Sequence, residues 1–215
     1  SILISTTGSA AAQAAREGEK TESKKTWDPE VIATVSQLEN ALRNGKTEIT
    51  LDKKFTWEVT GSASLFLPSD DTIRISGPEG GKNLVIKNGG FNFYEGSWEF
   101  DRIDITCSKK SAVLYACDDA RVVWNGSVKT TAGNALCTVA DAQVRVNGNL
   151  DGTSKDYTTV AVIDHSHAEI NGNVSSNTNN AIVVKENGSL IMNGNVKTGA
   201  SKNYPSVYVY SGSLV

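Results

Sequence analysis

The fold of this chain is decided by one short pattern that occurs four times: Val-Trp-Asn-Gly-Ser-Val (123–128), Arg-Val-Asn-Gly-Asn-Leu (145–150), Glu-Ile-Asn-Gly-Asn-Val (169–174) and Ile-Met-Asn-Gly-Asn-Val (191–196). The Asn-Gly pairs follow one another at steps of 22, 24 and 22 residues. A fixed period in this range indicates one supersecondary unit that stacks on copies of itself. The repeat therefore predicts an architecture, whereas it does not by itself specify a reaction.

Residues at equal distances from the Asn-Gly pairs are apolar in every repeat. Polar residues stand between the apolar positions, and this alternation is typical of a strand with one buried face. Because the same class of residue recurs in each column, we expect equivalent residues to stack on one another. The apolar columns are Trp124, Val146, Ile170 and Met192; Val122, Val144, Ala168 and Leu190; Val128, Leu150, Val174 and Val196; and Leu114, Leu136, Val160 and Ile182.

This repeat favours a parallel β-helix. It is shorter than the ~40 residues of a propeller blade and lacks the leucine-rich repeat pattern. We predict an all-β chain, a right-handed parallel β-helix with coils of about 22 residues and a short N-terminal capping helix. Asn tolerates and Gly prefers positive φ, so each pair is expected at a sharp corner. A series of independent Asn-Gly hairpins is the alternative. In the β-helix, the side chains of Asn125, Asn147, Asn171 and Asn193 would form an amide ladder.

The segment before the strands contains the predicted helix. Ser36 to Glu39 matches a capping box, and Leu38, Ala41 and Leu42 give the following residues an apolar face. Asn44-Gly45 is expected to end the helix, because Gly suits a left-handed C′ position. Short alternating segments follow, among them Phe55–Val59, and turn residues separate them, which indicates strands.

Composition excludes several classes of function and suggests two regions. The net charge of the 215 residues is −3 and no basic stripe is present, so a nucleic-acid partner is not expected. No apolar run is long enough to span a membrane. Residues 1–26 are predicted to be a polar linker or a trimmed export segment, and residues 27–215 the β-helix domain. Because Gly212–Val215 resembles Gly188–Ile191, we expect this domain to be incomplete at its C-terminal end, and its open edge favours end-to-end self-association.

Three cysteines occur, Cys107, Cys117 and Cys137, without a CxxC motif. This odd set gives little support for a disulfide framework or a zinc site. We predict that they are small buried side chains.

The N-terminal part of the predicted domain resembles a known group. The helix with Leu38 and Leu42, then Thr47–Leu51 and Thr72–Gly77, is similar to the entry of right-handed β-helix proteins of the pectate-lyase-like superfamily, and to bacterial adhesin-like members in particular. The resemblance covers most of residues 27–215. It implies a secreted or surface-displayed protein that acts on polysaccharide or adheres to it. It also implies where a lyase would work, at clustered carboxylates that hold calcium beside an Arg or Lys base.

Acidic residues recur at the corner that precedes each Asn-Gly strand. Asp118, Asp119, Asp141 and Asp164 are the candidate calcium or catalytic carboxylates, with Arg121 nearby. Oxygen ligands suit Ca²⁺, and stacked carboxylates need a cation. A solvated turn is the alternative, because Asp is favoured in turns.

The two histidines suggest a second kind of site. His165 and His167 would point to one face of a strand, and Asp141 and Asp164 are the further ligands that a metal would need. Two exposed polar residues are the simpler interpretation.

Tyrosines provide a candidate ligand-binding surface. Tyr208 and Tyr210 alternate with valines, and with Tyr204 they would form an outward patch for sugar or protein. Trp57, Trp98 and Trp124 are expected in the core instead. Ordinary strand decoration is the alternative for the tyrosines.

The sequence thus favours a non-catalytic β-helix module that is extracellular or displayed on the cell surface, and that serves adhesion or binds a polysaccharide or surface glycan. Two alternatives stay open. One is a polysaccharide lyase or hydrolase that uses the Asp-rich corner. The other is an extracellular sensory module of a larger membrane-anchored protein.

Overall fold

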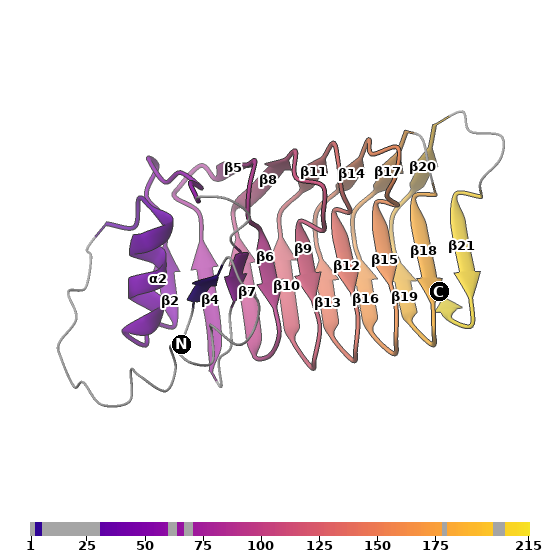
Figure 1. Ribbon diagram of the computed structural model, residues 1–215, viewed down its shortest axis with the longest axis horizontal. Coiled ribbons are helices and arrows are strands. Elements are labelled where there is room, and N and C mark those ends of the chain that lie inside the picture. Colours follow the sequence, from indigo (N-terminus) through magenta and orange to yellow (C-terminus); the bar gives the residue numbers. More distant parts are fainter. Residues whose placement is uncertain (1–2, 6–30, 60–63, 67–70, 178–179, 200–204) are drawn as a thin grey trace.

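Three β-sheets run along the long axis of the molecule, and successive coils of the chain follow one another along that axis (Figure 1). The computed structural model describes residues 3–5, 31–59, 64–66, 71–177, 180–199 and 205–215. Among these residues every strand pair is parallel except β1 with β3. The predicted parallel β-helix is confirmed, and independent hairpins are excluded because neighbouring strands in the sequence do not pair across the Asn-Gly turns.

Each full coil contributes one strand to each sheet. Sheet 1 contains β1 (Leu3–Ser5), β3 (Ser64–Phe66), β6 (Phe91–Phe93), β9 (Leu114–Ala116), β12 (Leu136–Thr138), β15 (Val160–Val162), β18 (Ile182–Lys185) and β21 (Val207–Tyr210). Sheet 2 contains β2 (Glu48–Thr50), β4 (Thr72–Ser76), β7 (Ser97–Asp101), β10 (Arg121–Asn125), β13 (Gln143–Val146), β16 (His167–Ile170), β19 (Ser189–Met192) and β22 (Ser213–Leu214). Sheet 3 contains β5 (Lys82–Ile86), β8 (Ile103–Cys107), β11 (Val128–Thr130), β14 (Leu150–Gly152), β17 (Val174–Ser176) and β20 (Val196–Thr198).

The apolar columns lie in register inside the three sheets. Val122 pairs with Val144, Val144 with Ala168, and Ala168 with Leu190, as the spacing predicts. The predicted columns are buried, apart from Met192 and Val196, which are partly buried. Trp57, Trp98 and Trp124 lie in the same core, and the Trp124 ring stacks on Phe100 with centroids 4.5 Å apart. One continuous core therefore extends through all coils.

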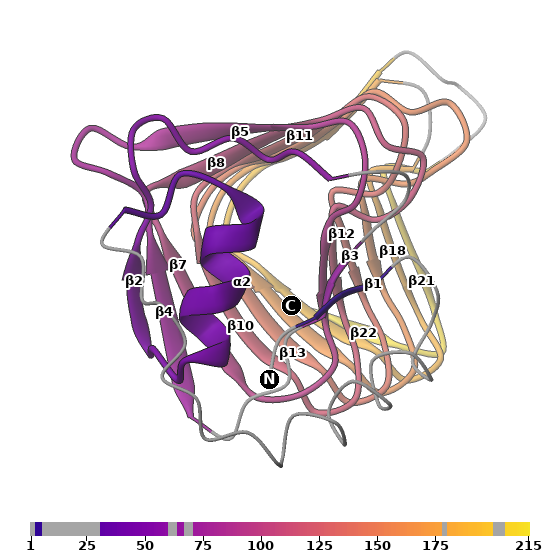
Figure 2. The same ribbon diagram turned by 60° about the vertical axis from the view of Figure 1, so that its left-hand side comes forward.

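Helix α2 (Val35–Arg43) covers the end of this core (Figure 2). Its Val35, Leu38, Ala41 and Leu42 are buried, and Gly45 follows with a φ of 79°. Among the described residues, no helix has the length and apolar composition that crossing a bilayer requires.

The helix begins two residues earlier than the sequence predicted. Thr34, not Ser36, is the N-cap: its hydroxyl accepts from the Gln37 backbone N–H at 3.1 Å. The Gln37 side chain in turn accepts from the Thr34 backbone N–H at 3.1 Å. A helix that starts after Thr34 is favoured over one that starts after Ser36, because it includes Val35 and buries its side chain.

The strand predicted at Phe55–Val59 is wrong. Phe55 and Trp57 are buried and Thr56 and Glu58 are exposed, so the alternation is real. The backbone joins no sheet, however, because the Thr56 N–H donates to the Ala33 carbonyl at 3.2 Å, beside the helix start. Only an isolated bridge forms.

Glycine is needed at the Asn-Gly corner for a different reason from the predicted positive φ. None of the four Asn-Gly pairs has a positive φ. Instead, a Cβ on Gly172 would lie 2.0 Å from the carbonyl oxygen of Gly148, and a Cβ on Gly148 would lie 1.9 Å from that of Gly126. Glycine is required because each coil lies directly against the backbone of the preceding coil.

Two ladders of side chains join the coils at this corner. In the first, the predicted amide ladder, the Asn147 amide donates to Asn125 at 2.6 Å, Asn171 to Asn147 at 2.7 Å and Asn193 to Asn171 at 2.8 Å. The Asn125 amide donates to Asp101 at 2.5 Å, which starts the row.

In the second ladder, side-chain oxygens accept from the backbone N–H of the next coil. Asn149 accepts from Asn173 and Asn173 from Asn195, each at 2.9 Å. This row starts at Asp104, which accepts from the Ser127 N–H at 2.7 Å. The first ladder thus needs donors, whereas the second needs acceptors only.

Replacing Gly172 with alanine tests the backbone contact. The added methyl group would overlap the Gly148 carbonyl, so we expect the free energy of unfolding to fall by about 3 kcal/mol or more in urea titrations. Gly45→Ala is the control, because that position has open space and a φ of 79°. It should lose only about 1 kcal/mol, the cost of a left-handed residue. Equal losses in the two variants would contradict the stacking explanation.

Exchanging asparagine for aspartate separates the two ladders. Asn147→Asp removes the donor to Asn125, so at neutral pH the free energy of unfolding should fall by about 1 kcal/mol. Asn173→Asp retains the acceptor for the Asn195 N–H, so its stability should change by less than about 0.5 kcal/mol. Both are measured by urea denaturation. Equal effects would show that charge at this corner matters more than the direction of the hydrogen bonds.

Candidate functional site

The Asp-rich corner consists of tight turns between sheet 1 and sheet 2. In each turn two successive residues have positive φ, as in type I′ turns. The Ala120 N–H donates to the Cys117 carbonyl at 3.2 Å and closes the first turn. Asp and Asn are favoured in such a backbone, so the turn alone accounts for the residue types. The turns are centred on residues 118–119, 140–141, 164–165 and 186–187.

The candidate catalytic residues do not converge. Asp118, Asp119 and Asp141 are exposed on successive turns. Arg121 begins β10, is exposed, and lies in register with Gln143 on sheet 2. Among the described residues, Arg121 forms no ion pair with these aspartates. The structure therefore stacks the predicted acids without joining them to the predicted base.

The two histidines contact different neighbours. His165 lies in a turn, with Nδ1 3.0 Å from an Asp164 carboxylate oxygen and Nε2 3.3 Å from the Asn187 amide. His167 lies on β16, with Nδ1 2.7 Å from the Ser189 hydroxyl. In the part of the chain that the structure describes, no group of three or more His, Cys, Asp or Glu side chains is arranged to hold a metal ion.

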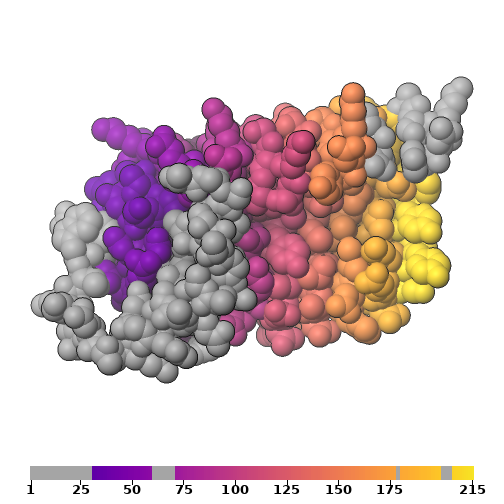
Figure 3. Space-filling view, viewed as in Figure 1, coloured from indigo at the N-terminus to yellow at the C-terminus, as the bar shows by residue number. Residues whose placement is uncertain are grey.

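The predicted tyrosine patch is placed in part. Tyr208 and Tyr210 lie on β21 and are 46% and 64% exposed. The end that carries β21 is at the right of the space-filling view (Figure 3). Tyr204 lies outside the described residues.

Tyr208 belongs to an uncharged row on the outer face of sheet 1. The row follows the register of the sheet, and the structure places Tyr115, Cys137, Ala161, Val183 and Tyr208 in it. The outer face of sheet 2 differs, because it carries ion pairs such as Arg145 with Glu169 at 3.2 Å. An outer face with few charges is a candidate contact surface.

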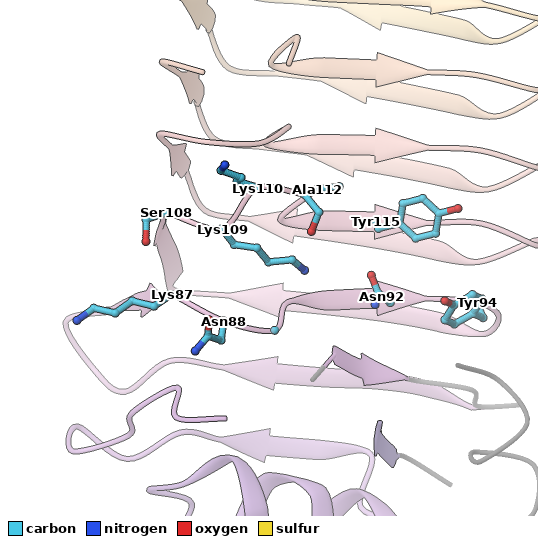
Figure 4. A pocket seen from close by; sticks show the side chains of 11 residues that line it. Lys87, Asn88, Asn92, Tyr94, Ser108, Lys109, Lys110, Ala112 and Tyr115 are labelled. Carbon is cyan, nitrogen blue, oxygen red and sulfur yellow. The ribbon is translucent and has the colours of Figure 1, made fainter. Parts of the chain in front are cut away.

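A groove adjoins the N-terminal part of this face (Figure 4). It has a volume of about 690 Å³ and lies between the connection from β5 to β6 and the connection from β8 to β9. We call it the basic groove, because three lysines and no acidic residue line it. Its principal side chains are Lys87, Asn88, Asn92, Tyr94, Lys109, Lys110 and Tyr115.

Lys109 is the lysine that points into the basic groove (Figure 4). Its side chain is half-buried, and burial lowers its pKa. Gly90 makes room for it, because a Cβ there would lie 2.7 Å from the Lys109 Nζ. Lys87 and Lys110 are exposed. A partly desolvated ammonium group is well placed to bind an anion.

Tyr94 and Tyr115 form the other side of the basic groove. Their rings are in an edge-to-face arrangement with centroids 6.5 Å apart. Burial, together with smaller contributions from the neighbouring Cys117 and Cys137, raises the pKa of Tyr115 to about 12. Burial also raises the pKa of the Cys117 thiol to about 12. These groups are therefore neutral at physiological pH and offer hydroxyl donors and apolar ring faces.

The three cysteines occupy three different environments. Cys107 lies in the core, as predicted, whereas Cys137 is half-buried on the outer face of sheet 1. Cys117 is 5% exposed and lies at the end of β9, outside the core cluster. All three are free thiols.

The sequence analysis missed the lysines of the basic groove. They lie before the Asn-Gly repeats, in connections that share no motif. An alignment of β5 with β8 would have brought these lysines together. Ile86 pairs with Cys107, and continuing this register places Lys87 beside Ser108 and Asn88 beside Lys109. Finding it requires the alignment of coils that have no common sequence pattern.

Comparison with known proteins adds no family to this description. No protein-family model matches the chain, and neither does any curated protein or solved structure.

Proposed function

We propose that this β-helix is a non-catalytic module that binds anionic polysaccharide, and that it is extracellular or displayed on the cell surface. The observation that carries the proposal is the basic groove, which combines three lysines with two tyrosines beside a sheet face with few charges. The resemblance to adhesin-like β-helix proteins supports the location and the use in adhesion.

The chemistry of the basic groove suits an acidic sugar. Lysine ammonium groups bind carboxylates and sulfates through charge-assisted hydrogen bonds. Tyr94 and Tyr115 present an apolar ring together with a hydroxyl group, which matches the two kinds of surface on a sugar ring. Asn88 and Asn92 add donors and acceptors that fix orientation.

A lyase or hydrolase at the Asp-rich corner is the alternative, and so is a sensory module of a larger membrane-anchored protein. No specific observation favours either one. The acidic turns and Arg121 share no ion pair among the described residues, so we propose binding without turnover.

A pair of double variants tests the basic groove. Lys109→Ala/Lys110→Ala should weaken retention on immobilised polygalacturonate or sulfated polysaccharide at least tenfold, because two lysines each contribute about 1 kcal/mol. Lys129→Ala/Lys197→Ala removes the same charge from the outer face of sheet 3 and should leave retention within twofold. Tyr115→Ala should weaken retention to a smaller extent.

The same assay, run with and without calcium, records unsaturated or shortened product. Retention without product supports the proposal. Calcium-dependent product that is lost in Asp119→Ala would move the function to the Asp-rich corner. Equal losses in both lysine pairs would show that net charge, and not the basic groove, causes retention.

A further inference from the structure

Strand β5 has one edge that pairs with no described strand. It is the terminal strand of sheet 3, and β8 is its neighbour on the other side. The Lys82 N–H donates to Arg102, and the Ile86 carbonyl accepts from Ser108. In a parallel ladder alternate residues bond to the same neighbour, so Asn83 and Val85 direct their N–H and carbonyl groups away from β8. No described residue bonds to these four backbone groups.

A second groove lies along this edge, because the described residues of the preceding coil supply no strand there. Residues 55–59 lie beside β5 but do not pair with it. The Thr56 N–H donates to the Ala33 carbonyl, and the Trp57 indole donates to the Asn88 carbonyl at 3.0 Å. The space between residues 55–59 and β5 has a volume of about 480 Å³. We call it the edge groove.

The edge groove has apolar side chains in its middle and a lysine at each end of β5. Val85 is 55% exposed, whereas Leu84 and Trp57 are buried. Lys82 and Lys87 stand at the two ends of β5, and the Lys82 ammonium bonds to the Lys53 carbonyl at 2.5 Å. Lys82 and Lys87 are the two lysines in its lining, and Glu58 is the one acidic residue among the described residues that line it.

We propose that β5 binds an extended acidic peptide, which pairs with Asn83 and Val85 as an additional strand of sheet 3. Main-chain hydrogen bonds supply the pairing, as in other cases of strand addition. The lysines select acidic side chains, and exposed Val85 contacts an apolar residue between them.

A peptide fits this edge better than a second copy of the chain does. Two copies that paired through β5 would bring their lysines together, and like charges on facing strands are destabilising. A polysaccharide cannot continue the ladder, because it has no regular row of N–H and carbonyl groups. The edge groove shares Lys87 and Asn88 with the basic groove, but Val85 lines the edge groove and not the basic groove, so variants at Val85 test the peptide site separately.

The test uses a capped synthetic peptide, Glu-Val-Glu-Val-Glu-Val-Glu, with a fluorescent label, and measures anisotropy on the whole chain. We expect saturable binding that slows amide hydrogen exchange at Asn83 and Val85. The same peptide with every backbone nitrogen methylated keeps its charge but has no donors, and should bind at least tenfold more weakly.

Val85→Pro removes one free N–H at a position where an edge strand accepts proline, and should also weaken peptide binding at least tenfold. Val85→Ala, which retains the backbone donor, should stay within threefold. Polysaccharide retention should be unchanged in both variants. If Val85→Pro fails to fold by circular dichroism, the methylated peptide and the exchange data still decide.

Three results would overturn the proposal: no binding of the peptide, equal binding of the methylated peptide, or unchanged exchange at Asn83 and Val85. Equal binding of the methylated peptide would show that the edge groove attracts acidic peptides by charge alone, without main-chain hydrogen bonds.

Discussion

The close contact between glycine backbones at the Asn-Gly corner is the constraint on which the rest of the structure depends. With a Cβ only 2.0 Å from the Gly148 carbonyl, position 172 can hold no other residue without a shift of the coil. Strands in a sheet lie about 4.8 Å apart. The glycines let the corner keep that same spacing, so that all three sheets stay in register. The apolar columns stack because the corner permits it.

The direction of the side-chain ladders follows from this spacing. Every amide of the first ladder donates toward the preceding coil, so the row must begin at a group that accepts without having to donate. Asp101 is such a group, because an ionised carboxylate is an acceptor only. Asparagine can continue the first row, since it both accepts and donates. In the first ladder the residue type therefore changes from Asp101 to Asn125, at the point where the repeat begins.

The sequence predicted the parts of the fold that repeat. Columns such as Val122, Val144 and Ala168 could be aligned because their period is constant, and the coil architecture follows. The repeat did not show which property of glycine is used, because absence of a Cβ and tolerance of positive φ select the same residue. The helix start was ambiguous for a similar reason, since Thr34–Gln37 and Ser36–Glu39 both match the capping pattern. Burial of Val35 decides between them, and burial is a tertiary property.

The basic groove could not be predicted in the same way. Its lysines come from two connections of different sequence, and the position of Lys109 depends on the space at Gly90 in the neighbouring coil. The Asp-rich corner, by contrast, stood out in the sequence because its turns recur. Residues that recur in every coil are those that the fold requires, and a repeat reveals them. The basic groove occurs once, so no repeat reveals it.

The separation of groove and repeat has a consequence for how the length of such a protein changes in evolution. The coils from β10 onward carry the ladder, and each contacts its neighbours in the same way. Duplication or loss of one such unit would change the length by about 4.8 Å and leave the terminal carboxylates and the basic groove untouched. Genes for relatives of this chain are therefore expected to differ by whole coils inserted after Asn125, with the N-terminal coils constant in number. Length and ligand can then be selected independently.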